Sequence, residues 1–466
     1  MTKNKIKVLV VSAFLLVIVC CTQTQQPPAN NSSNTNIKTT EVATGAQAAC
    51  AASADWLSNP QNAPKEITGT GQRTICQFHQ FSWQTFLALM NQPQGAAERA
   101  FEDEKNFPLL LAKGENSCGE NAVQSRLFVR TVKDDNGPHD DFILPERIDQ
   151  AAKTNEATIY DQNGNVVFYE VRFSRTACDP QIDKMFPDGT TELKVSYRVI
   201  TEAEKSSYVW INPEVTEMVD GKPKTEKKLL GMIGFHLMRS TPEHPEFIWA
   251  SFEHKQTAPE CQSAAAANAP AWTFTSQPCA AQLPNSVDPK LCNFNLADTH
   301  TALSGGKPTQ ICKVYHAGSK PGDFLFDQNV AAIDSLNAQL TGPDGMLAKL
   351  SGSSLSVLQN YQLIGSLWLI DPKLPSQQPG KPTTDTSNQV GSLQLANPTM
   401  ETTFQQFKVA ANGDATPVGY TGNKDLQPAA NCFFCHRYEP GFNVKTSHIF
   451  ADIKGQPKPN SSPQGK

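Results

Sequence analysis

The sequence predicts an α+β protein, in which a large disulfide-containing domain with a β-rich centre precedes a short, mostly helical or irregular C-terminal segment. The chain has 466 residues, enough to bury one large core or two smaller ones. Helical and strand-like patterns mix along it without the βαβ alternation that is typical of a parallel sheet. Eight cysteines between residues 50 and 312 are available for cross-links.

The composition excludes several classes of protein. Lys and Arg number 40 against 45 Asp and Glu, which gives a formal charge of −5, and the chain has no basic block. We therefore expect no nucleic-acid partner, because such partners are bound through clustered positive charge. The only long apolar run lies at the N-terminus, which argues against a polytopic membrane protein.

Residues 1–21 resemble a bacterial export signal with a lipid-attachment site. Three lysines and no acidic residue precede an apolar run that is short for a membrane span. Ile18 stands three places before Cys21, as in lipoprotein processing sites, although Cys20 occupies a place where Gly, Ala or Ser is usual. We expect lipidation at Cys21, with simple cleavage or a retained anchor as alternatives. Each exports the chain to the periplasm or cell surface, and Thr22 favours an outer membrane.

Polar segments flank the part of the chain that is expected to fold. The N-terminal one is rich in Gln, Pro, Asn, Ser and Thr and predicts a disordered tether. The C-terminal one is rich in Pro, Ser, Gly and Lys and predicts a loose tail. The expected organisation is a leader at 1–21, a tether at 22–45, an α+β main domain at 46–371, a polar loop at 372–392, a C-terminal segment at 393–454 and a disordered tail at 455–466.

Helices and strands of the main domain are predicted in order along the chain. Residues 77–91 carry apolar side chains at helical spacing, which predicts a buried helix. Residues 324–340 predict a second, amphipathic helix, and residues 354–370 end in a strand. Alternating or wholly apolar runs between turn signals predict the other strands, at 157–161, 166–175, 192–200, 208–213, 229–239 and 246–254. The first two of these strands are joined by Asn163-Gly164, which predicts a hairpin.

A Cys-x-x-Cys-His run occurs once, at Cys432, Cys435 and His436. Two thiols at this spacing can each add to a vinyl group of haem, and the histidine can then ligate the iron. A chain of this composition would contain such a run by chance roughly 0.006 times. The run resembles the attachment motif of c-type cytochromes, which implies one covalent haem c with His436 as proximal ligand. The alternatives are a redox Cys-x-x-Cys pair and a zinc site.

The position of the motif departs from that of small cytochromes c, because only 30 residues follow His436 and none is methionine. We therefore expect the haem on a short segment that packs against a larger, different domain. The first candidate for the distal ligand is His448, which follows His436 after a turn signal at residues 439–441. Met400 is the second candidate, and a histidine of the main domain or an open site are the remaining alternatives.

The remaining eight cysteines are expected to form up to four disulfides, because their number is even and the compartment is oxidising. The order along the chain favours Cys50 with Cys76 and Cys118 with Cys178. The pairing within the last four stays open, namely Cys261, Cys279, Cys292 and Cys312.

A further group of polar residues lies in or near the last two strands of the β-rich centre. His236 stands inside one of them, and His254, Glu253, His244 and Arg239 lie on or near the next strand and turn. If these strands pair antiparallel, His236 and His254 would face one pocket with Glu253 at its rim, where they could relay protons. The alternative is a hydrogen-bonded core histidine beside a wet turn, and the chain matches no peroxidase or oxidase motif.

Together, the motif and the leader predict an exported single-haem c-type cytochrome that carries electrons to or from an unidentified redox partner. The lipid anchor would hold it at a membrane surface. A haem-dependent oxidoreductase of peroxidase or oxidase type is the alternative, because electron transfer alone does not need so long a chain. A surface binding or sensing protein is the third reading. Whether the protein is an enzyme stays open, and the electron carrier is favoured.

Overall fold

The computed structural model describes most of the chain beyond its N-terminal region. Its contacts group Ala49–Lys466 into one unit, and Met1–Ala48 forms another. The expected leader with Cys21, the whole expected tether and the tail beyond residue 455 lie outside the described residues. No helix within the described ranges is long and apolar enough to cross a membrane. These ranges are 50–67, 75–111, 116–119, 128–129, 159–219, 222–263, 271–284, 292, 294–295, 308–381, 385–401, 407–409, 415–417 and 431–455.

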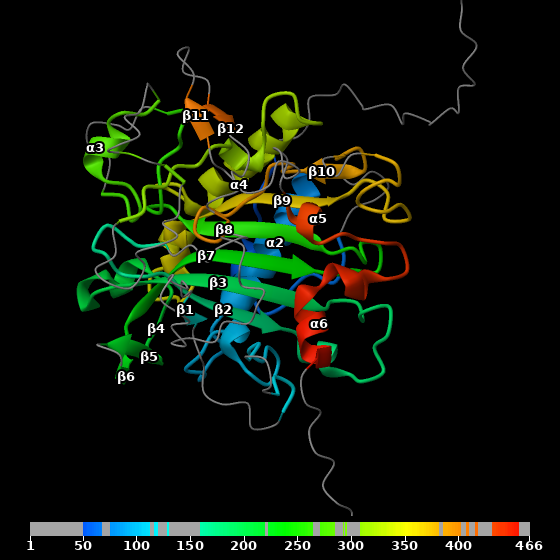
Figure 1. The fold of residues 1–466 in the computed structure, drawn as a ribbon, viewed down its shortest axis with the longest axis horizontal. Helices are drawn as coiled ribbons and strands as arrows, with labels where there is room; N and C mark the ends of the chain where they lie inside the picture. The colour runs from blue at the N-terminus through cyan, green and yellow to red at the C-terminus, as the bar shows by residue number, and fades with distance from the viewer. Residues whose placement is uncertain are drawn as a thin grey trace, which may run out of the picture. The chain divides into compact units, whose positions relative to one another are not determined.

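An antiparallel sheet runs through this unit (Figure 1). Its strands lie in the order β1-β2-β3-β7-β8-β9-β10, and β4 also pairs with β7. They are β1 (Phe128–Val129), β2 (Phe168–Phe173), β3 (Thr191–Val199), β4 (Trp210–Ile211), β7 (Leu230–Arg239), β8 (Ile248–His254), β9 (Tyr361–Leu369) and β10 (Gln389–Gly391). Two hairpins stand apart from it, formed by β5 (Glu214–Val219) with β6 (Lys222–Lys227) and by β11 (Phe407–Val409) with β12 (Ala415–Pro417).

Two long helices cover one face of the sheet, α2 (Ile75–Met90) and α4 (Phe326–Thr341). The apolar side chains of α2 meet residues of β7 and β8, where Phe86 stacks on Phe252 with ring centroids 4.0 Å apart. Helix α4 packs against α2 and β9. The other α-helices are short: α1 (Asp55–Ser58), α3 (Gln277–Ala280), α5 (Cys432–Cys435) and α6 (His448–Gly455). Turns of 3₁₀-helix lie at Ala100–Glu102, Arg175–Cys178, Glu202–Ser207, His316–Gly318, Leu347–Lys349, Ser356–Asn360 and Asn443–Thr446.

The predicted α+β class is confirmed, since helices accompany a mostly antiparallel sheet. Both long helices and the strands β2, β3, β4, β7, β8 and β9 lie where the patterns predict them. In the described part of the strand predicted at 157–161, only an isolated bridge forms, between Tyr160 and Val166. The β5–β6 hairpin was not predicted. Within the expected polar loop, residues 389–391 form β10, because they pair with β9 at the sheet edge. All eight cysteines are bridged, as Cys50–Cys76, Cys118–Cys178, Cys261–Cys312 and Cys279–Cys292, and the two pairings favoured from the sequence are confirmed.

The second face of the sheet is covered by the chain that follows β10. This segment approaches the strands so closely that a Cβ atom at Gly365 would lie 2.2 Å from Ser392 Oγ. A Cβ atom at Gly234 would lie 2.5 Å from Thr399 Oγ1. Asn397 anchors the segment, because its Nδ2 donates to the Phe252 carbonyl at 3.1 Å. The two glycines therefore let residues 392–401 lie directly on the sheet, and this segment ends at Glu401.

Candidate haem site

The Cys-x-x-Cys-His run folds as the short helix α5, whose start is tied to the sheet edge. Asn431 precedes the helix, and its side chain accepts a hydrogen bond from the Phe433 N–H at 3.0 Å. The same side chain donates to Gln389 of β10 at 2.7 Å. Phe433 is buried in the core of this face, which leaves Cys432 and Cys435 half-buried beside it. Neither thiol is in a disulfide, and burial raises the pKa of the Cys432 thiol well above its usual value.

His436 is buried and held in one orientation. Its Nδ1 lies 2.8 Å from the Thr446 carbonyl oxygen, and a carbonyl can only accept, so Nδ1 carries the hydrogen. Burial, aided by the nearby positive groups, holds the pKa of His436 well below its ordinary value. The ring is therefore neutral, with its lone pair on Nε2. Metal-binding histidines in proteins show this arrangement, in which the other ring nitrogen donates to a carbonyl.

Two aromatic rings pack around His436. Trp249 of β8 lies with its ring centroid 4.7 Å away, and His448 stacks on His436 at 4.2 Å with an interplanar angle of 26°. His448 Nε2 also lies 3.2 Å from the Cys435 carbonyl. His448 thus packs directly against the His436 ring instead of facing it across a space. Met400 is buried in the core of this face and does not line the pocket described next.

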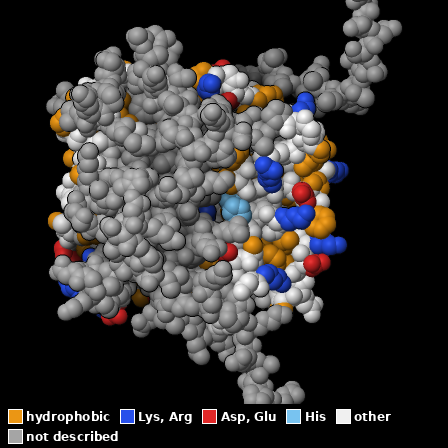
Figure 2. Space-filling view, in the orientation of Figure 1, with side chains coloured by type: hydrophobic (Ala, Val, Ile, Leu, Met, Phe, Trp, Pro, Cys, Tyr) orange, Lys and Arg blue, Asp and Glu red, His pale blue; other side chains and the backbone are white. Residues whose placement is uncertain are grey.

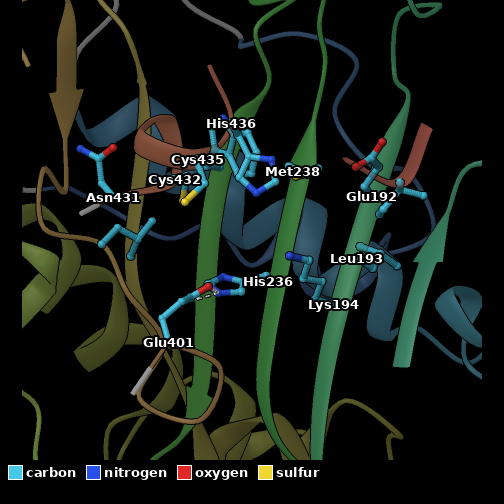
Figure 3. Close-up of a pocket in the computed structure, with 13 residues that line it drawn as sticks. Glu192, Leu193, Lys194, His236, Met238, Glu401, Asn431, Cys432, Cys435 and His436 are labelled. Carbon is cyan, nitrogen blue, oxygen red and sulfur yellow. Dashed lines mark hydrogen bonds and ion pairs between the residues drawn. The ribbon is translucent and has the colours of Figure 1, made fainter. Parts of the chain in front are cut away.

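A pocket lies between α5 and the sheet and is partly open to solvent. Figure 3 shows Cys432, Cys435 and His436 at one end of it and His236, Lys194 and Glu401 at the other. It is lined by Glu192, Leu193, Lys194, His236, Met238, Trp249, Leu395, Glu401, Asn431, Cys432, Cys435, His436 and Ile449. In Figure 2, Lys and Arg side chains lie beside hydrophobic ones on the side of the molecule formed by α5 and α6.

The register of the sheet arranges the pocket floor in two rows. Glu192 of β3 pairs with Met238 of β7, which pairs with Trp249 of β8. The second row lies two residues further along the strands, where Lys194 of β3 pairs with His236 of β7. Because side chains two residues apart on a strand share a face, both rows point into the pocket, about 6.6 Å apart. The first row lies toward the His436 end, where Trp249 contacts that ring, and the second lies toward the other end.

The far end of the pocket holds a hydrogen-bonded pair formed by His236 and Glu401. Both carboxylate oxygens of Glu401 lie within hydrogen-bond distance of His236 Nε2, at 2.7 and 2.9 Å. The Asn397 N–H donates to Glu401 Oε2 at 2.6 Å. Burial alone would raise the pKa of Glu401, but His236, this N–H and Lys194 hold it below its usual value, so the side chain is a carboxylate. Burial lowers the pKa of Lys194, and nearby Glu401 opposes that change.

Glu192 is a second buried carboxyl group on the pocket wall. Burial raises its pKa to about 7, and the hydrogen bond from Ser447 works in the other direction. That bond is donated by Ser447 Oγ to Glu192 Oε1. The other oxygen, Oε2, is buried with no hydrogen-bond partner among the described residues. The indole N–H of Trp249 is also buried with no such partner there. Both groups belong to pocket-lining residues, as expected of a site that receives a further molecule.

The group of histidines predicted from β7 and β8 is only partly brought together. The strands do pair antiparallel, but His236 pairs with Ser251, and His254 lies an odd number of residues further on. His254 therefore points to the opposite face, where it stacks on Tyr208. Glu253 binds Lys313 at 2.7 Å instead of lying at the rim of the pocket.

The two other residues of that group also lie away from the pocket. His244 pairs with Glu246, with 2.8 Å between Nδ1 and Oε1. Arg239 donates to the Gly189 carbonyl at 3.1 Å. Besides the motif, three charged residues share the pocket with His236 and were not singled out from the sequence, namely Glu192, Lys194 and Glu401. One signal was available, since Glu192, Lys194 and Ser196 alternate with apolar residues along β3 and mark a polar stripe on one face.

The residues present fit a covalently bound haem by their chemistry. Two half-buried thiols flank a buried neutral histidine with its lone pair on Nε2, and all three line one pocket. By themselves, the described residues contain no group of three or more His, Cys, Asp or Glu side chains arranged to hold a metal ion. No family model matches the chain, and comparisons with curated proteins and with solved structures found no similar protein.

Proposed function

We propose that the protein is an exported, single-haem c-type cytochrome that acts in electron transfer. The observation that carries the proposal is the placement of the Cys-x-x-Cys-His run, whose cysteines and histidine line a pocket between α5 and the sheet. Cys432 and Cys435 would hold the haem through two thioether bonds, and His436 Nε2 would be the proximal ligand. A haem bound here supplies a one-electron redox centre. This chain's own residues orient the ligand, since Thr446 holds His436 in one tautomer.

The experiment that tests this proposal is a pyridine haemochrome assay on protein exported by a host that attaches haem to c-type cytochromes. We expect a c-type band with one haem per chain, and a haem that is reduced and reoxidised reversibly in a spectroelectrochemical titration. A protein that folds, forms its disulfides and carries no covalent haem under these conditions would contradict the proposal.

Export and anchoring are part of the same proposal and rest on residues 1–21. The four disulfides support an oxidising compartment, because such bonds are rare where thiols are kept reduced. We propose that Cys21 carries the lipid and that the protein lies in the periplasm or at the cell surface. Incorporation of a labelled fatty acid tests this, and the label should be lost in the Cys21→Ala variant. Equal labelling of both proteins would exclude Cys21 as the lipidated residue.

A second candidate function is that of a haem-dependent oxidoreductase. The observation that favours it is the polar end of the pocket, where His236, Glu401 and Lys194 converge opposite the motif. A simple electron carrier does not require charged groups there, since a buried charge is costly to keep. The visible spectrum separates the two functions. A low-spin spectrum that resists added ligands supports the carrier, and a high-spin spectrum that changes with cyanide supports the oxidoreductase.

A further inference from the structure

We propose that the end of the pocket formed by His236, Glu401 and Lys194 binds a small weak acid, H–X, and that His236 takes its proton. The weak acid would lie on the side of the haem that faces away from His436. This inference rests on the covalent haem of the proposed function and names the chemical class of molecule that the pocket would accept.

The spacing of the two rows on the sheet supports a site on that side. The row containing Trp249 lies against His436, and the row containing His236 and Lys194 follows two residues later, about 6.6 Å along the strands. The row containing Trp249 thus lies at the His436 end of the pocket, and the row containing His236 and Lys194 lies at the opposite end.

The hydrogen bonds of His236 make it suited to act as a base. A carboxylate can only accept, so His236 Nε2 carries the hydrogen that Glu401 binds at 2.7 Å. In the neutral ring, the lone pair is then on Nδ1, which can accept a proton. Glu401 stabilises the imidazolium that results, as a buried carboxylate does for a catalytic histidine. The side chains of His236 and Glu401 are 15% and 12% exposed, so the proton can be returned to water.

Lys194 supplies the charge that favours the conjugate base. It pairs with His236 in the register of β3 and β7, lines the pocket and is influenced by Glu401 and Glu192. The groups that face His236 are thus Lys194 from β3, Ser251 from β8 and Glu401 from the segment over the sheet. An anion left in the pocket would be attracted by the Lys194 ammonium group, and the attraction is strong because little water is present.

The step is balanced without an oxidant or a reductant. The H–X bond breaks, its proton passes to His236 Nδ1, and the electron pair of the bond stays on X⁻. The anion would lie near Lys194, and a haem held by Cys432, Cys435 and His436 would supply the iron to which it could bind. The reverse transfer from His236 releases H–X again. Removing a positioned base of this kind commonly slows a proton transfer by about 10²–10⁴-fold.

The test uses the ferric full-length protein with cyanide as probe, because cyanide is present as the weak acid HCN at neutral pH. Stopped-flow absorbance gives the rate of binding. We expect His236→Ala to bind cyanide at least a hundredfold more slowly, and Glu401→Gln to be slower by a smaller factor. His316→Ala is the matched histidine control and should keep the rate of the unchanged protein, because His316 is exposed and does not line the pocket.

Azide separates the roles of the base and the cation, because azide is already an anion at neutral pH. Its binding rate should change little in His236→Ala, whereas its affinity should fall in Lys194→Met. The binding of either probe is measured by absorbance and does not depend on any enzymatic activity. Circular dichroism and the haemochrome band show whether a variant has folded and carries haem.

Three results would overturn the inference while leaving the proposed function intact. One is a haem-containing protein that binds neither cyanide nor azide. Another is a His236→Ala variant whose spectrum changes from low-spin to high-spin, since His236 would then be the axial ligand. The last is equal cyanide binding by the protein and by both the His236→Ala and Glu401→Gln variants. A missing c-type haemochrome band contradicts the proposed function itself.

Discussion

Replacing Cys432 and Cys435 together with alanine is expected to abolish covalent haem attachment. The reason is chemical, because each thioether bond needs one of these sulfurs. Haem that remains should be removed by acidified acetone, and the pyridine haemochrome band of a c-type haem should be absent. Each single variant should keep one thioether bond and show a haemochrome band shifted toward that of free haem.

The matched control for this prediction is another pair of cysteines. Cys279 and Cys292 lie 13 residues apart in the sequence, are joined in a disulfide and do not line the pocket. The Cys279→Ala/Cys292→Ala variant should retain the covalent haem while losing stability. Covalent haem that persists in the Cys432→Ala/Cys435→Ala variant would show that the attachment site lies elsewhere in the chain.

Replacing Lys313 with methionine is expected to lower the free energy of unfolding by about 3–5 kcal/mol. Lys313 Nζ lies 2.7 Å from Glu253 Oε1 and 3.4 Å from Glu260 Oε1, and Lys313 and Glu253 are buried. Burial alone would lower the pKa of Lys313, but the two carboxylates raise it above its usual value. Methionine of similar length would leave Glu253 charged and without its cation in the core. Urea unfolding of the two proteins measures the difference.

Two further variants show whether the lost charge pairing is the cause. Lys313→Met/Glu253→Gln removes the carboxylate as well and should recover part of the stability. Lys445→Met breaks an exposed pair with Glu439, whose atoms are 2.5 Å apart, and should cost less than about 1 kcal/mol. A Lys313→Met variant that is no less stable than Lys445→Met would show that the buried pair contributes nothing.

Local patterns predicted the fold class and most of its elements. Alternation of polar and apolar residues placed β3, and apolar spacing of 3.6 residues placed α2, because each depends only on neighbours along the chain. Two disulfides followed from chain order alone. The hairpin of β5 and β6 was missed because β6 carries mostly charged residues and the apolar residues of β5 do not alternate regularly with polar ones, so no clear periodic pattern marks it.

The site was predicted in part. The sequence by itself predicts which residues would hold a haem, because the thiols and the histidine of the attachment motif lie within five residues of one another. It did not determine what faces that motif. His236 and Glu401 are 165 residues apart, and no local pattern joins them.

Only the tertiary structure decided that Gly365 and Gly234 let the segment after β10 lie on the sheet, which places Glu401 against His236. Sheet register likewise decided that Lys194 lies beside His236 in the pocket and that His254 does not. The physical reason is that these contacts depend on close approach between distant segments, whereas covalent attachment depends on side chains a few residues apart.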